Sequence, residues 1–177
     1  MAIKKPRMSY NKQEYQKLID REINNYSKLN HPLLPKFIGT TKIENFLVIE
    51  FIKGKTLSNI KQFNLRHDEK IKIIWQLMDV LDFLHHKKHI YRDLKPNNVM
   101  IDDNKNVVLI DFDRIIDFND PHRTCESSPN FAAPEIQSEN LTFKCDVYSL
   151  GQMIYFIINE TEPDIIINKF YIKKFTN

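Results

Sequence analysis

A glutamate in the middle of an apolar helix face is the feature that most constrains how this chain folds. Residues 12–30 are spaced as an amphipathic helix, because apolar side chains recur on one face at about 100° per residue. That face is formed by Tyr15, Leu18, Ile19, Ile23, Tyr26 and Leu29. Glu22 falls within it. Since burying a carboxylate without a partner is costly, we predict that a cation from outside the helix pairs with Glu22.

The rest of the chain shows short strand patterns followed by mostly helical ones. Gly54 breaks the strand pattern, and a wide apolar arc over residues 68–86 is typical of the central helix of a lobe. The expected strands are 37–41, 46–52, 99–101 and 107–110, with a turn at 102–106, a long loop from 111 to about 135 and another buried helix at 145–159. This order favours an α+β protein with two lobes.

Two polar segments carry candidate chemistry. The loop YRDLKPNN, from Tyr91 to Asn98, places Asp, Lys and Asn close together, and thirteen residues after Asn98 a strand ends in DFD, from Asp111 to Asp113. Phosphoryl transfer needs such groups: a carboxylate that orients the attacking hydroxyl, a cation at the transferring phosphoryl, and oxygen ligands for Mg²⁺. Either segment alone is equally consistent with a polar turn between two hairpins. Together, in this order, they indicate a phosphoryl-transfer site.

These motifs resemble those of eukaryotic protein kinases. YRDLKPNN resembles the kinase catalytic loop, and DFD resembles the DFG metal-binding motif. Three more motifs complete the family order: AIKK at 2–5 resembles the VAIK strand, AAPE at 132–135 the end of the activation segment, and DVYSLG at 146–151 the start of the long helix after it. The resemblance covers nearly the whole chain. It implies the two-lobed α+β kinase fold, with a partial small lobe at 1–52 and a partial large lobe at 53–177.

The resemblance implies a role for each polar residue of the catalytic loop. Asp93 would accept or orient the substrate hydroxyl, and Lys95 would contact the γ-phosphate. Lys95 in its DLKP context also implies a Ser or Thr acceptor on a protein substrate, rather than Tyr. Asn98 and Asp111 would hold Mg²⁺ against the phosphates. The segment at 27–39 is similar to that of the tyrosine-kinase-like group of Ser/Thr kinases.

The resemblance also implies that ATP lies between the lobes. Lys4 would contact the α- and β-phosphates and pair with Glu22, which would explain the carboxylate on the apolar helix face. Backbone groups of Glu50 and Ile52 in the hinge would bond adenine, and the side chains of Ala2 and Met100 would enclose its ring. The implied cofactors are therefore ATP and Mg²⁺.

Residues near the catalytic aspartate imply regulation by phosphorylation. Arg92 before Asp93 is typical of kinases that are activated by phosphorylation of the loop. Counting back from AAPE places Thr124 at the phosphorylated position and Ser128 where it would contact Asp93 and Lys95. In place of the commoner His the loop that resembles the catalytic loop has Tyr91, and some active members of the family also have Tyr there.

Three departures from the family pattern bear on activity. The chain begins at the VAIK-like strand, so we expect the glycine-rich loop to be missing. Asp113 replaces the glycine of DFG, which removes a permissive φ and adds a charge near the metal. The chain ends soon after the DVYSLG helix, so we expect no arginine partner for Glu135. We therefore expect a fragment of a longer kinase or a truncated copy, with negligible activity and with self-association through an exposed apolar run at 153–158.

Two alternatives from other classes stay open. Small-molecule kinases of the aminoglycoside-phosphotransferase type share the DxxxxN loop and often end the next strand in IDFD, although they lack APE. A pseudokinase or scaffold, which binds partners without catalysis, is consistent with a missing phosphate lid. Against that alternative, the chain retains Lys4, Glu22, Asp93, Lys95, Asn98 and Asp111.

Composition argues against several other classes. A net charge of +3 gives no case for a nucleic-acid partner. The apolar runs at 46–52 and 153–158 are too short to span a bilayer, and the start lacks the apolar region of a signal peptide. The two cysteines form no CxxC pair, so we expect a reducing compartment, the cytoplasm or the nucleus. The histidines at 85, 86 and 89 have no Cys or carboxylate partner at the spacing of a metal site, so we predict structural or exposed positions for them.

Overall fold

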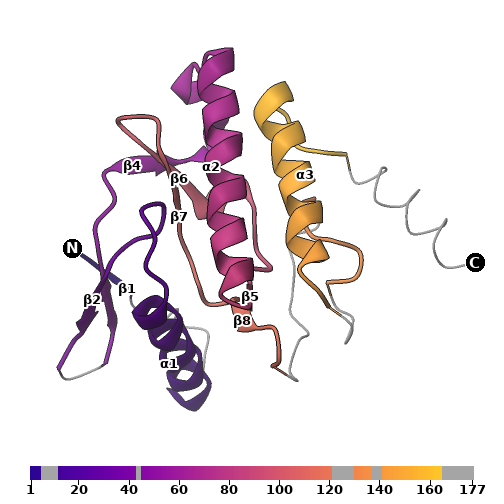
Figure 1. The fold of residues 1–177 in the computed structure, drawn as a ribbon. Helices are drawn as coiled ribbons and strands as arrows, with labels where there is room; N and C mark the ends of the chain where they lie inside the picture. Colours follow the sequence, from indigo (N-terminus) through magenta and orange to yellow (C-terminus); the bar gives the residue numbers. More distant parts are fainter. Residues whose placement is uncertain (5–11, 43–44, 121–129, 137–140, 165–177) are drawn as a thin grey trace, which may run out of the picture.

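The computed structural model describes residues 1–4, 12–42, 45–120, 130–136 and 141–164, with only the backbone described for 12–15. Within these ranges the chain forms helices and small antiparallel sheets in two parts, which confirms the predicted α+β class (Figure 1). Every helix in the described part is too short or too polar to cross a membrane.

The small lobe is a three-stranded antiparallel sheet beside one helix. The strands are β1 (Ala2–Lys4), β2 (Phe37–Thr40) and β3 (Leu47–Ile49), in the order β1-β3-β2, and the helix is α1 (Lys12–Lys28). The helix predicted at 12–30 is present, and Ile19, Tyr26 and Leu29 are buried on its predicted face. The strand predicted at 46–52 is shorter, because its pairing with β1 ends where Ala2 meets Ile49.

The large lobe contains two long helices that lie side by side (Figure 1). These are α2 (His67–His86) and α3 (Lys144–Asn159). The large lobe also contains a three-stranded sheet in the order β4-β6-β7 and a two-stranded pair, β5–β8. The strands are β4 (Gly54–Thr56), β5 (His89–Ile90), β6 (Val99–Asp102), β7 (Val107–Leu109) and β8 (Ile116–Asp117). Two 3₁₀ helices are η1 (Leu57–Phe63) and η2 (Pro96–Asn98).

Gly54 begins a strand, where the sequence predicts a break. Its backbone pairs with Asp102 of β6. A Cβ atom at position 54 would collide with the carbonyl oxygen of Ile101, so the position excludes every side chain. The glycine is therefore explained by a close approach of two strands and not by a chain break.

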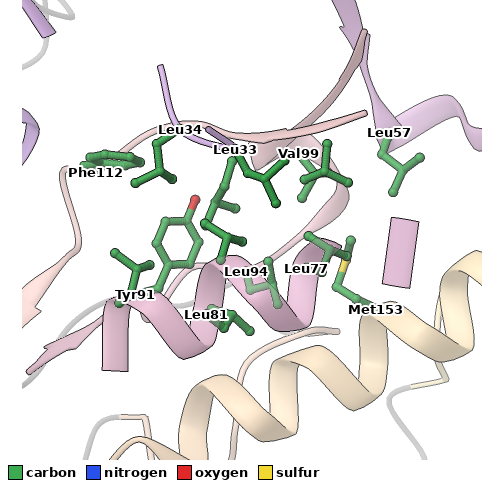
Figure 2. Close-up of a cluster of buried hydrophobic side chains, with 14 of the residues drawn as sticks. Leu33, Leu34, Leu57, Leu77, Leu81, Tyr91, Leu94, Val99, Phe112 and Met153 are labelled. Atoms are coloured by element: carbon green, nitrogen blue, oxygen red, sulfur yellow. The ribbon is translucent and has the colours of Figure 1, made fainter. Parts of the chain in front are cut away.

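One hydrophobic core joins the two lobes. Figure 2 shows Leu33 and Leu34 packed near Tyr91 and Phe112, in the same cluster that reaches Met153 of α3. The N–H of Leu109 also donates to the carbonyl of Leu33 at 2.9 Å. Because this core lies directly under the YRDLKPNN and DFD segments, it fixes where those segments sit.

The apolar run at 153–158 is not exposed as a whole, so that expectation is wrong in part. Met153, Phe156 and Ile157 are buried, whereas Tyr155 and Ile158 are 42% and 41% exposed. The reason is helical spacing: positions i, i+3 and i+4 share one face, and that face of α3 packs into the core. Only the opposite face is open.

A buried carboxylate on α3 holds the catalytic loop in place. Asp146 has no solvent exposure. Its Oδ1 accepts a hydrogen bond from the Arg92 N–H, and its Oδ2 accepts one from the Tyr91 N–H, both at 2.8 Å. Nε2 of His85 also lies 2.8 Å from Oδ2. Arg92 has a φ of 69°, a left-handed conformation that costs about 1–3 kcal/mol, and these bonds offset that cost.

Replacing Asp146 by Asn should destabilise the protein while keeping the volume of the side chain. We expect Asp146→Asn to lower the free energy of unfolding by about 3 kcal/mol, because breaking a buried charged network typically costs ~3–5 kcal/mol and the Asn oxygen still accepts one bond. Urea unfolding followed by circular dichroism measures the change. Asp82→Asn, at an exposed position on α2, is the control and should change stability by less than about 0.5 kcal/mol. Equal, small effects of both would contradict the role of Asp146.

Candidate active site

The cation predicted to meet Glu22 is Lys4. Its Nζ lies 2.7 Å from Oε1 of Glu22, so the predicted pair is confirmed. The same Nζ lies 2.6 Å from Oδ1 of Asp111, which comes from the DFD segment. Strand β1, helix α1 and the DFD segment therefore meet at one ammonium group.

The charges of these three groups depend on one another. Burial alone would lower the pKa of Lys4, but the carboxylates of Glu22 and Asp111 outweigh it and raise that pKa to about 12. Burial would raise the pKa of Asp111, but Lys4 outweighs it and the pKa is lowered. For Glu22, burial prevails over Lys4 and the pKa is raised. Lys4 is thus cationic and Asp111 anionic at neutral pH.

The catalytic loop brings its three predicted residues together. Lys95 Nζ lies 2.9 Å from Oδ2 of Asp93 and 3.0 Å from Oδ1. Pro96 begins the turn η2, in which the Asn98 N–H donates to the Lys95 carbonyl at 3.0 Å. That turn returns the Asn98 side chain to Asp93, where Nδ2 donates to Oδ2 at 2.8 Å and to the carbonyl at 2.9 Å. Since the nitrogen faces Asp93, the amide oxygen of Asn98 is the atom left to bind a metal.

A backbone bond places the two predicted metal ligands near each other. The Ile110 N–H donates to the Asn98 carbonyl at 2.9 Å, and Asp111 follows directly. Asp111 itself has a φ of 67°, a left-handed conformation that turns the chain out of the strand. Residues held in this strained backbone conformation are common at functional sites.

Arg114 is a site residue that the sequence analysis missed. Its Nη1 lies 3.6 Å from Oδ1 of Asp93, and its carbonyl accepts a 2.6 Å hydrogen bond from Nε of Arg92. Asp93 is therefore contacted by two cations, Lys95 and Arg114. The only sequence signal was the position directly after DFD, which predicts no contact by itself.

Asp113 stands where the kinase motif has glycine. It does not adopt a positive φ, so the permissive backbone of glycine is not required here. Its Oδ1 is buried and, among the described residues, has no hydrogen-bond partner. Burial and the neighbouring Asp111 charge both raise the pKa of Asp113. The second carboxylate of DFD is therefore held in an unfavourable environment.

The residues predicted to bind adenine lie on the expected elements. Ala2 lies on β1 and Met100 on β6, and both are half-buried. The Glu50 N–H already donates to the Lys36 carbonyl at 2.9 Å, so Glu50 can offer adenine only its carbonyl. A cavity of about 390 Å³ borders Glu50 and Ile52 but is not lined by Ala2 or Met100. The adenine roles stay predictions.

Several other candidates fall outside the part of the chain that the structure describes. Thr124 and Ser128, predicted in the activation segment, lie there.

Cys145, at the start of α3, has a buried thiol whose pKa is raised by burial. Such a thiol is inert.

Comparison with known proteins identifies the family. A family model described as the protein kinase domain matches residues 1–169. The chain belongs to the protein kinase domain family. The SNF1-like protein kinase ssp2 of Schizosaccharomyces pombe (strain 972 / ATCC 24843) is 32% identical over 147 residues, which cover 79% of this chain and 26% of that protein. This kinase-domain chain thus spans about a quarter of the length of that relative.

Protein kinases generally use ATP with Mg²⁺, and the residues present fit the metal. Mg²⁺ prefers oxygen ligands and usually takes one or two carboxylates, with water and substrate phosphates completing the shell. The Asp111 carboxylate and the Asn98 amide oxygen provide that kind of donor set. In the described ranges, no group of three or more His, Cys, Asp or Glu side chains is placed to hold a metal ion.

Neutralising Asp113 should stabilise this kinase domain. Asp113→Asn removes the repulsion from Asp111 and supplies an NH₂ donor, so we expect the free energy of unfolding at pH 7 to rise by about 1 kcal/mol. Thermal unfolding by calorimetry measures it. Asp103→Asn, on the exposed β6–β7 turn, is the control and should have little effect. A loss of stability in Asp113→Asn would show that the charge is required.

Proposed function

We propose that this chain is an ATP-dependent protein serine/threonine kinase. The observation that carries the proposal is a pair of polar side-chain clusters. In the first, Lys4 contacts Glu22 at 2.7 Å and Asp111 at 2.6 Å. In the second, Asp93 contacts Lys95 at 3.0 Å and Asn98 at 2.8 Å. The first group supplies a phosphate-binding cation and a metal ligand. The second supplies a base, a cation and a further metal ligand. Together these are the groups that phosphoryl transfer needs.

The proposed reaction assigns one task to each residue. Asp93 orients the substrate hydroxyl and takes its proton while the hydroxyl oxygen bonds to the γ-phosphorus and the bond to the ADP oxygen breaks. Lys95 offsets the negative charge on the transferring phosphoryl. Lys4 holds the α- and β-phosphates. Mg²⁺, bound with ATP, would supply further positive charge against the phosphates.

Two observations support a Ser or Thr acceptor. Lys95 lies within hydrogen-bond distance of Asp93, in the DLKP context that resembles Ser/Thr kinases. The relative with 32% identity is named an SNF1-like protein kinase. The DLKP context supports a Ser or Thr acceptor, and the name of the relative supports a protein substrate.

The catalytic assignment predicts loss of phosphorylation in two variants. With Mg-ATP and a generic Ser/Thr protein substrate, Asp93→Asn should abolish the low rate that we expect of the wild-type chain, because it removes the base. Lys4→Met should raise the KM for ATP. Lys17→Met, exposed on α1, is the control and should behave as wild type. Phosphoamino-acid analysis should show phosphoserine or phosphothreonine. Undiminished activity in Asp93→Asn would sink the assignment.

A second candidate function is binding without catalysis. A hollow of about 480 Å³ between α2 and α3 is lined by the apolar side chains of Trp75, Met78, Leu81, Val147 and Leu150 and by the polar ones of Asp79, Asp82 and His85. Trp75 and Val147 are 64% and 59% exposed, and exposed apolar patches commonly mark interaction sites. Because the sequence predicts self-association through apolar side chains of α3, and Val147 and Leu150 lie on that helix, we propose that a second copy of this chain covers this surface. Mg-ATP binding without Asp93-dependent phosphorylation would favour this candidate.

Self-association through this hollow has a built-in reporter. Trp75 is the only tryptophan of the chain, so its fluorescence should shift to shorter wavelength as protein concentration rises. Val147→Lys should abolish the shift and reduce the mass seen by light scattering. Ile38→Lys, at an exposed apolar position on β2 in the other lobe, is the matched control. A wild-type spectrum that does not depend on concentration would contradict the proposal.

A further inference from the structure

A buried asparagine on α1 contacts the DFD segment, and no motif predicted it. Asn25 is 4% exposed. Its Nδ2 donates to the carbonyl of Phe112 at 3.1 Å and to the carbonyl of Ile115 at 3.2 Å. A carbonyl can only accept, so both contacts require the NH₂ group of the amide. A polar side chain on a core-facing helix position is costly unless it is bonded, and here both donors are used.

The neighbours of Asn25 on α1 contact the same segment. Oε1 of Glu22 lies 3.4 Å from the Phe112 N–H, which donates to it. The ring of Tyr26 stacks on the ring of Phe112 at 4.0 Å, with an angle of 11°. Positions i, i+3 and i+4 of a helix share one face. This face of α1 therefore meets the DFD segment through a carboxylate, an amide and a ring.

The two carbonyls lie on either side of Asp113 and Arg114. The Ile115 N–H donates to the Phe112 carbonyl at 3.3 Å, so residues 112–115 form a turn that Asn25 spans. Asp111, directly before this turn, is bonded to Lys4. A change in the turn would move Asp111 away from Lys4, because only Phe112 separates Asp111 from Asp113.

We propose that Asn25 is a positioning residue that ties α1 to the DFD turn and so keeps Asp111 within reach of Lys4. The catalytic part of this proposal rests on the proposed function, in which Asp111 is a ligand of the metal. Asn25 does not touch the reacting atoms. It acts through the Phe112 and Ile115 carbonyls, and reversal of the DFD turn would leave its buried amide without partners.

Two variants separate the hydrogen bonds from packing. Asn25→Leu keeps a similar volume and removes both donors. Asn25→Asp keeps the shape and places an acceptor against two carbonyls. Asn24→Leu and Asn24→Asp are the matched controls, because Asn24 precedes Asn25 on α1 and is exposed.

The first measurement is hydrogen exchange of backbone amides without nucleotide. We expect the Phe112 and Ile115 amides to exchange about tenfold faster in both Asn25 variants, the effect of losing roughly one hydrogen bond. Amides of α2 should exchange as in the wild type, which also shows that the variants fold. If Asn25→Asp does not fold, Asn25→Leu alone decides the result. Unchanged exchange at residues 112 and 115 would overturn the proposal.

The second measurement is the affinity for Mg-ATP. Asn25→Leu should weaken binding about tenfold when affinity is measured well below the melting temperature of the variant, where all of the protein is folded, which a purely structural role would not produce. If wild type itself does not bind Mg-ATP, the proposed function fails, whereas the exchange result still decides the role of Asn25. Wild-type affinity in both Asn25 variants, with faster exchange, would overturn the catalytic part of the proposal.

Discussion

The carboxylate of Asp146 connects helix α3 to the YRDLKPNN loop. It is fully buried, and it bonds the backbone of two consecutive residues, Tyr91 and Arg92. These bonds hold the left-handed turn at Arg92, and that turn directs the next residue, Asp93, toward Lys95 and Asn98. The position of the proposed base therefore depends on a charge that takes no part in chemistry.

Some of the site could be predicted because its signal lies in local pattern. A carboxylate in an apolar helix stripe requires a cation, and the sequence offered Lys4 at a position that fits the family. The short turn from Asp93 to Asn98 is encoded by a proline at the first position of η2. In the first case the periodicity of one helix shows that a cation is needed, and in the second case neighbouring residues in the sequence specify the geometry.

Other features could not be predicted because they depend on tertiary contacts. The contacts of Asn25 exist only because the DFD turn packs against α1, and those of Arg114 only because the residue after DFD lies beside the YRDLKPNN loop. The apolar run on α3 is different, because helical spacing alone indicates that only one of its faces packs into the core. The strand before the hinge ends early because its partner has only three residues, and an apolar pattern contains no information on the length of a partner.

The shared core has a mechanical consequence. Leu33 and Leu34 belong to the small-lobe side of the chain, yet they pack with the side chains beneath the catalytic loop (Figure 2). The Leu109 N–H to Leu33 carbonyl bond adds a fixed point between the lobes. The small lobe cannot slide over the large lobe without opening this core. Relative motion of the two lobes would therefore be a rotation about the Leu109–Leu33 hydrogen bond.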